Sequence, residues 1–115
     1  MKSYFIGLLG EGKSLNYLKK QGLKPVASRV RLGRGEIDLV MRQGDCTVFV
    51  EVKYRPKGQA GDGLEAVTHD KRRRMMQAAA LYLEQNGLWN TPARFDVLEI
   101  TAQGICYLPN AFDFE

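Results

Sequence analysis

The residues from Gly35 to Arg55, GEIDLVMRQGDCTVFVEVKYR, constrain the fold of this chain more than any other stretch. On both sides of Gly44-Asp45, residues of apolar and polar character alternate, a pattern typical of half-buried strands. The dipeptide between them suits a two-residue hairpin turn with glycine in the first central position. The stretch therefore predicts an antiparallel β-hairpin.

Counting outward from this turn gives the register of the predicted hairpin. On one face the alternation puts Ile37, Leu39 and Met41. The other face carries charge, and the acids at positions 38 and 51 would be directly opposed, with Cβ atoms about 4.5 to 5.5 Å apart. Two like charges at that distance are destabilising unless something offsets them. The predicted pairs are Gln43 with Cys46, Met41 with Val48, Asp38 with Glu51, and Glu36 with Lys53.

A divalent cation would offset this crowding of carboxylates. Carboxylate oxygens are hard ligands that suit Mg²⁺ or Mn²⁺. Such an ion keeps positions for a phosphate oxygen and an attacking water. Lys53, two residues beyond Glu51 on the same face, would either help to deprotonate that water or stabilise negative charge on the phosphate oxygens. The pattern predicts a phosphodiester-cleaving site built from Asp38, Glu51 and Lys53.

Asp38, followed by Glu51-Val52-Lys53 at the end of an apolar strand, resembles the PD-(D/E)xK nuclease signature, and its spacing is similar to that of archaeal Holliday junction resolvases. Other segments resemble the YraN-like family of small bacterial proteins that are predicted to be nucleases. The resemblance covers nearly the whole chain. It implies a restriction-endonuclease-like fold and a metal-dependent endonuclease of DNA, with branched or junction DNA as a candidate substrate. The segments are GEIDLV, VFVEVKYR, EAV followed by Lys71, ALYL and RFDVLEI.

The resemblance also adds residues to the predicted site. Glu11 lies in GEGKSLNYLKKQG, which matches the opening helix of the family. Related nucleases place a glutamate of this helix beside the two sheet carboxylates, so the resemblance makes Glu11 the third acid and metal ligand. From the sequence alone, an exposed helix glutamate explains it better. Lys71 occupies a position that the family pattern marks as basic, and we expect it to contact phosphate. Arg29 departs from the family pattern, which usually has asparagine there.

Several other cations are candidates for contacts with nucleic acid. Some precede or begin a glycine-rich loop after the hairpin, which would close over a phosphodiester or serve as a plain connector. Others lie on the first predicted strand or in the turn that follows it, where a solvated edge strand explains them almost as well. Positions 71–74 are four consecutive cations in a predicted helix, so some of them face solvent whatever the function. The candidates are Arg31, Arg34, Arg55, Lys57, Lys71 and Arg72.

Length and charge bound the class of protein. A chain of 115 residues is expected to form one domain, residues 1–115. The net charge of +4 favours anionic partners, and with the motif it favours nucleic acid, DNA above all. The apolar run in the opening MKSYFIGLLGEGK is too short for a signal peptide or a membrane span. We therefore expect a cytoplasmic protein that does not bind membranes.

The remaining periodicity predicts an α/β fold with two helices packed against a mixed central sheet, in the order α-β-β-β-α-β-β. Thr68 is expected to cap the second helix, and Gly87 to follow its end. Trp89 is expected to anchor the next loop on the core. Asp96 is interpreted as structural, because no lysine accompanies it at the spacing of the motif. The predicted helices span 3–20 and 68–85, and the predicted strands span 24–31, 36–41, 47–55, 94–101 and 105–108.

Two questions stay open at this level. A binding protein that keeps the nuclease-like fold and the basic surface without cutting DNA is the alternative to an enzyme. The resolvases that the chain resembles act as two-fold dimers on two strands, so a homodimer and a monomer whose C-terminal tail folds back on its own sheet are both consistent with the sequence. The candidates for a dimer interface are Tyr4, Phe5, Tyr107, Phe112 and Phe114.

Overall fold

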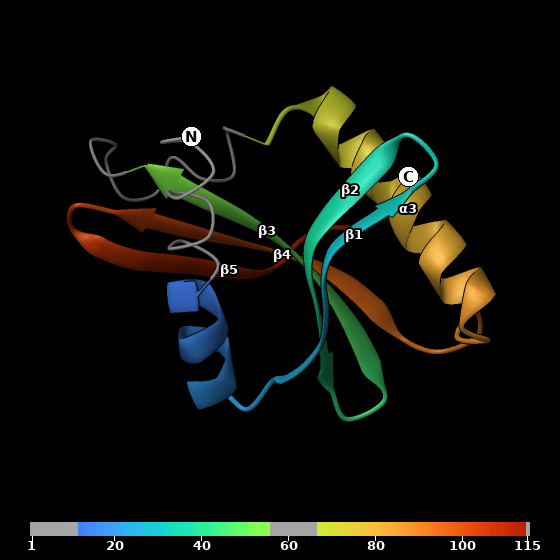
Figure 1. Cartoon of the computed structure of the whole chain (residues 1–115), viewed down its shortest axis with the longest axis horizontal. Helices are drawn as coiled ribbons and strands as arrows, with labels where there is room; N and C mark the ends of the chain where they lie inside the picture. Colours follow the sequence, from blue (N-terminus) through green and yellow to red (C-terminus); the bar gives the residue numbers. More distant parts are fainter. Residues whose placement is uncertain (1–11, 56–66, 115) are drawn as a thin grey trace.

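The computed structural model describes residues 12–55 and 67–114 (Figure 1). Five strands form one sheet in the order β1-β2-β3-β4-β5. The β3 and β4 strands pair in parallel, whereas the other neighbours are antiparallel, so the sheet is mixed. The predicted fold class and order of elements are confirmed. The elements are a helix over residues 12–20, β1 (Lys24–Leu32), β2 (Gly35–Gln43), β3 (Cys46–Arg55), α3 (His69–Gln85), β4 (Ala93–Thr101) and β5 (Gly104–Phe112).

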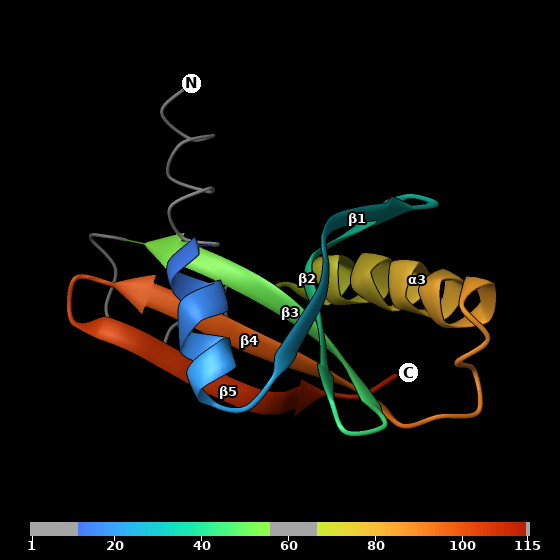
Figure 2. The ribbon, with the colours of Figure 1, turned by 60° about the horizontal axis from the view of Figure 1, so that its bottom comes forward.

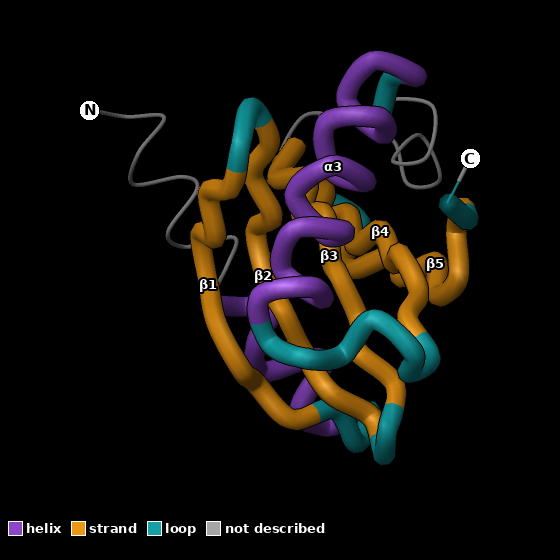
Figure 3. The backbone as a smooth tube through the Cα atoms, turned by 90° about the vertical axis from the view of Figure 1, so that its right-hand side faces the viewer, coloured by secondary structure: helices purple, strands orange, loops and turns teal. Residues whose placement is uncertain are grey.

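The two helices cover opposite faces of the sheet, as Figures 2 and 3 show. Alternation along β3 explains this arrangement, because successive side chains of a strand point to opposite faces. Phe49 packs in the core beneath α3, whereas Val48 and Val50 pack in a second core that includes Leu18 of the helix over residues 12–20. Both faces of β3 around Phe49 are therefore apolar and covered.

The β2–β3 hairpin forms as predicted near its turn. Gly44 has a φ of 59°, as the first central position of the turn requires. The predicted pairs nearest the turn, Gln43 with Cys46 and Met41 with Val48, are both present. The ladder ends at Leu39 and Val50, so the two charged pairs predicted beyond it, Asp38 with Glu51 and Glu36 with Lys53, are not ladder partners.

The prediction that Ile37 shares a face with Leu39 and Met41 is wrong. Ile37 packs in the core beneath α3 together with Val40, whereas Leu39 packs in the opposite core. The change of face occurs where β2 leaves its ladder with β3. Arg29 of β1 has a left-handed φ of 51° at the same level, between the pairs that join Ser28 to Leu39 and Val30 to Ile37. A local irregularity in this ribbon re-aims the side chains near Asp38.

The β2 strand approaches α3 very closely at Gly35. A Cβ atom at this position would lie 2.0 Å from the backbone oxygen of Arg74 and 3.0 Å from the Cβ of Ala78. Only glycine allows this contact. The helix itself begins after Thr68, whose Oγ1 accepts a hydrogen bond from the Lys71 N–H at 3.2 Å, as predicted for a cap. These contacts fix the start of α3 relative to β2.

The prediction that Trp89 anchors the loop after α3 is wrong, because the side chain is 61% exposed. Leu88 packs against the core instead, and its N–H donates to the Leu83 oxygen at 2.8 Å. This hydrogen bond turns the chain at the end of α3. As a result, Leu88 points inward and its neighbour points outward.

The C-terminal aromatic residues fold back on the sheet of their own chain. Phe112 stacks on Phe95 with ring centroids 4.8 Å apart, and Phe114 meets the same ring edge-on at 4.8 Å. The Tyr107 hydroxyl donates a hydrogen bond to Asp96. Tyr4 and Phe5 lie outside the described residues. In the described ranges, no helix combines the length and apolar character that crossing a membrane requires.

Candidate active site

Asp38 and Glu51 come together on the face of the sheet that α3 covers. Asp38 Oδ2 accepts a hydrogen bond from the Val52 N–H at 2.8 Å, just beyond the last pair of the β2–β3 ladder. The carboxylate thus satisfies a backbone donor that β2 leaves unpaired as it diverges. Glu51 precedes this donor in β3 and is 2% exposed. The two acids are neighbours without being ladder partners.

One oxygen of the Glu51 carboxylate contacts two lysines, and the other has no hydrogen-bond partner among the described residues. Its Oε1 lies 3.0 Å from Lys71 Nζ and 4.0 Å from Lys53 Nζ. Its Oε2 is buried and has no hydrogen-bond partner among the described residues. Burial and the negative charge of Asp38 raise the pKa of Glu51 from 4.5 to about 8, although the positive charge of Lys71 opposes them. A buried carboxylate with an unpaired oxygen is costly unless a cation or proton meets it.

Lys71 enters this site from the first turn of α3. Burial alone would lower the pKa of its ammonium group, but Glu51, Asp38 and Glu36 raise the pKa above its ordinary value. Lys71 therefore stays charged. The sequence predicts that Lys71 contacts phosphate. In the structure its ammonium group also lies directly beside the two acids. The Lys53 side chain is 23% exposed and faces the same carboxylate from a longer distance.

The other predicted contacts with nucleic acid divide into three groups. Arg55 and Arg72 contact their own chain: Arg55 Nη1 lies 3.6 Å from Glu99 Oε2, and Arg72 Nε donates to the Val67 oxygen at 3.0 Å. Arg31 and Arg34 lie at the exposed end of the β1–β2 ribbon. Arg31 Nε is 3.5 Å from Glu36 Oε2. Lys57 lies outside the described residues.

The donor set at the acid pair fits a hard divalent cation. Two carboxylates meet there, and the unpaired Glu51 Oε2 is the kind of atom that Mg²⁺ or Mn²⁺ would satisfy. Within residues 12–55 and 67–114, no group of three acidic, histidine or cysteine side chains converges. The third ligand implied by the family resemblance, Glu11, lies outside the described residues.

Among the residues that the structure describes, the polar cluster around Asp96 contains no lysine. Arg94 donates to both Asp96 oxygens, at 3.1 and 3.2 Å, and the Asn110 N–H donates to Oδ1 at 2.8 Å. The Tyr107 hydroxyl also donates a hydrogen bond to Asp96. Since the Asn110 N–H and the Tyr107 hydroxyl both come from β5, two of these donors hold β5 to β4, and the structural interpretation of Asp96 is supported.

Comparison with known proteins shows which family this chain resembles. The model of "Uncharacterised protein family UPF0102" matches residues 10–100. A UPF0102 protein of Photorhabdus laumondii is 40% identical over 115 residues, 98% of this chain and 91% of the relative. One from Shewanella loihica is 44% identical over 92% of each chain, and the UPF0102 protein YraN of Salmonella agona is 43% identical over 90% of this chain and 80% of its own. These names assign no activity.

Proposed function

Since the chain belongs to the UPF0102 family, as its YraN-like segments indicated, and the family description names no activity, we propose a function from the site itself: a metal-dependent endonuclease that hydrolyses phosphodiester bonds in DNA. The observation that carries the proposal is the buried pair of Asp38 and Glu51, with one carboxylate oxygen unpaired and two lysines beside it. Branched or junction DNA is the substrate that the resemblance to resolvases favours.

Asp38 and Glu51 would hold Mg²⁺ or Mn²⁺, with Glu11 as a third ligand by resemblance. When bound, the ion supplies Lewis-acid activation of a water and of a phosphate oxygen. The Val52 N–H keeps the Asp38 carboxylate in one orientation, because a backbone donor in a strand cannot move away. The Glu51 carboxylate is fixed by burial on β3 and by its contact with Lys71.

Hydrolysis forms a bond between the water oxygen and phosphorus and breaks the bond from phosphorus to the leaving sugar oxygen, which takes up a proton. Negative charge builds on the non-bridging oxygens during this exchange. Lys53 and Lys71 carry positive charge beside the acid pair and would stabilise those oxygens. In the alternative role that the sequence motif allows, Lys53 would be neutral and would help to remove the proton of the water, and Lys71 alone would then stabilise the phosphate oxygens.

A nucleic-acid-binding protein that does not cut DNA is the second candidate, and one observation favours it. The described residues supply two carboxylates to the site, and Lys71 already neutralises part of their charge. If Lys71 offsets the negative charge of the acids, the site needs no metal ion. The surface could then bind phosphate without hydrolysing it. The two candidates share the basic surface and differ only in the chemistry at Asp38 and Glu51.

Purified protein with branched, nicked, single-stranded and duplex DNA separates the two candidates. Each substrate is incubated with Mg²⁺, Mn²⁺ or a chelator. For the endonuclease we expect metal-dependent cleavage that Asp38→Asn or Lys53→Ala abolishes. Asp45→Asn is the matched control, because this exposed carboxylate lies in the turn at the far end of the hairpin. Binding that survives every substitution, without cleavage of any substrate, would support the second candidate.

A further inference from the structure

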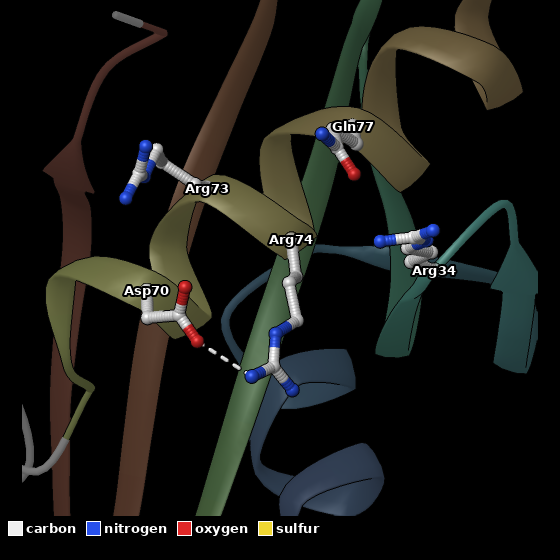
Figure 4. A pocket seen from close by; sticks show the side chains of 5 residues that line it. All are labelled: Arg34, Asp70, Arg73, Arg74 and Gln77. Carbon is white, nitrogen blue, oxygen red and sulfur yellow. Dashed lines mark hydrogen bonds and ion pairs between the residues drawn. The ribbon is translucent and has the colours of Figure 1, made fainter.

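The β1–β2 turn and the outer side of α3 enclose a second polar pocket. Its volume is about 530 Å³. Figure 4 shows Arg34 extending from the turn toward the helix, while Arg74 and Gln77 lie on α3 between it and Asp70. We call this pocket the arginine groove, and every side chain of its lining is charged or polar. It is lined by Arg34, Asp70, Arg73, Arg74 and Gln77.

The positive charge of the arginine groove is only partly compensated. Arg74 Nη2 lies 2.5 Å from Asp70 Oδ2, which neutralises one arginine. Neither Arg34 nor Arg73 has a hydrogen bond or ion pair with any residue in the described ranges. Two guanidinium groups at one pocket are thus left without an anion. Their planar donor forks match the oxygens of phosphate, which a guanidinium binds in a bidentate manner.

The arginine groove connects with the acid pair along the surface. Arg34 and Arg74 also line an adjacent depression of about 190 Å³, which reaches Glu36 and Lys71. Lys71 Nζ is in turn 3.0 Å from Glu51 Oε1. A track of cationic side chains therefore runs from the candidate cleavage site to the outer side of α3. A DNA strand carries one charge at every phosphate and is the kind of ligand that such a track fits.

We propose that the arginine groove binds two internal phosphodiesters of the DNA strand that also lies at Asp38 and Glu51. That the ligand is the DNA strand held at Asp38 and Glu51 rests on the proposed function. The groove adds Arg73 to the residues expected to contact DNA and directs the bound strand over the β1–β2 turn. An acidic peptide fits less well, because the groove has no apolar side chain to bind one.

Binding in chelator tests this proposal without any need for cleavage. The affinity for labelled duplex DNA is measured at several salt concentrations for wild type, for Arg34→Gln/Arg73→Gln, and for the control Lys19→Gln/Lys20→Gln. The control removes the same charge from exposed positions of the helix on the opposite face. The slope of log K against log salt is negative, and each lost phosphate contact reduces its magnitude by about 0.9. We therefore expect the magnitude to fall by about 1.8 for the groove variant. The control should keep most of the wild-type slope.

Equal slopes for the groove variant and the control would overturn the proposal. Oligonucleotides with a 5′-phosphate and with a 5′-hydroxyl distinguish the source of the phosphate. We expect the groove variant to weaken binding of both alike, and a loss confined to the phosphorylated ends would overturn an internal contact. A protein that binds through the groove without cutting would refute the endonuclease alone, whereas one that cuts with unchanged binding would refute the groove alone.

Discussion

Glu51 is the residue on which the electrostatics of the site depend most. It is buried, it neighbours Asp38, and two cations from different elements, Lys53 and Lys71, lie beside it. Burial and Asp38 raise its pKa to about 8, so a proton competes for the carboxyl group near neutral pH when no metal is present. A metal ion would have to displace that proton, so the acid pair couples metal binding to pH.

The first prediction concerns Glu51→Gln in chelator. The ordinary pKa of 4.5 applies in the unfolded chain, and burial beside Asp38 raises the pKa to about 8 in the folded chain. The stability that the protonated carboxyl contributes is therefore complete below pH 4.5 and is lost as the pH rises through 8. We expect wild type to lose stability over this range relative to Glu51→Gln, as urea denaturation at several pH values would measure.

At pH 9, without metal, Glu51→Gln should be at least as stable as wild type, because glutamine cannot carry the buried charge. Glu84→Gln, an exposed position of α3, is the control and should follow the wild-type profile. A clear loss of stability in Glu51→Gln at pH 9 would assign the carboxylate a structural role and argue against a metal site.

The second prediction concerns Lys71→Ala and the binding of duplex DNA in chelator. If Lys71 contacts phosphate, its loss should lower the salt slope of binding by about 0.9. Lys20→Ala provides a control of the same charge at an exposed position on the other face. An unchanged slope for Lys71→Ala would leave this lysine as the counterion of Glu51 and remove it from the contacts with DNA.

At the scale of elements, Gly35 sets the separation of β2 and α3, and with it the distance between Asp38 and Lys71. The third prediction is that Gly35→Ala destabilises the protein by about 2 kcal/mol or more, because the new Cβ would overlap the Arg74 backbone oxygen. Urea denaturation measures the change. Gly12→Ala is the control: a Cβ there meets nothing within 4 Å, so its stability should lie within about 1 kcal/mol of wild type.

Displacement of α3 in Gly35→Ala should also move Lys71 away from Glu51. Metal-dependent cleavage would then fall in any fraction of the variant that remains folded. A variant as stable as Gly12→Ala would mean that β2 and α3 can separate at little cost, and that the close approach is not what positions the site.

The elements that could be predicted from sequence are those that local rules determine. The turn at Gly44-Asp45 and the cap at Thr68 both follow from short-range hydrogen bonding. The position of Lys71 had a signal as well, because Lys71, Met75 and Ala78 lie on one helical face and the last two are buried. Because four consecutive cations cover all sides of a helix, the run by itself does not show that Lys71 is the one that lies beside the acids.

The rest depends on contacts between distant segments. The end of the β2–β3 ladder, which lets Asp38 accept the Val52 N–H, depends on how the β1–β2 ribbon leaves the sheet near Arg29. The alternation of apolar and polar residues in one strand does not show where that strand changes its pairing. For this reason the prediction for the face of Ile37 is wrong. The exposure of Trp89 follows from a hydrogen bond between Leu88 and Leu83, which residue type alone does not reveal.

At the scale of the whole molecule, the C-terminal tail belongs to the core of its own chain. Phe112 is stacked on the buried Phe95, so it is not available to a second copy without unpacking the sheet. The fourth prediction is that Phe112→Ala lowers the free energy of unfolding by about 2 kcal/mol and leaves the sedimentation coefficient at micromolar concentration unchanged.

Phe114→Ala is the matched variant, because this ring is 43% exposed and touches Phe95 only at its edge. Its effect on stability should be the smaller of the two. If Phe112→Ala instead converted a dimer into a monomer with little loss of stability, the tail would belong to an interface between copies of the chain.

The strand that carries Glu51 and Lys53 lies in the middle of the sheet, with β2 on one side and β4 on the other. Its amide groups can reach solvent only when a neighbouring strand detaches, whereas the ribbon of β1 and β2 can fray from the outer edge. Amide protons of β3 should therefore exchange with deuterium among the last in the protein. If the protein binds DNA as proposed, the β1–β2 ribbon could then shift to fit the bound strand while the strand that carries Glu51 and Lys53 stays in place.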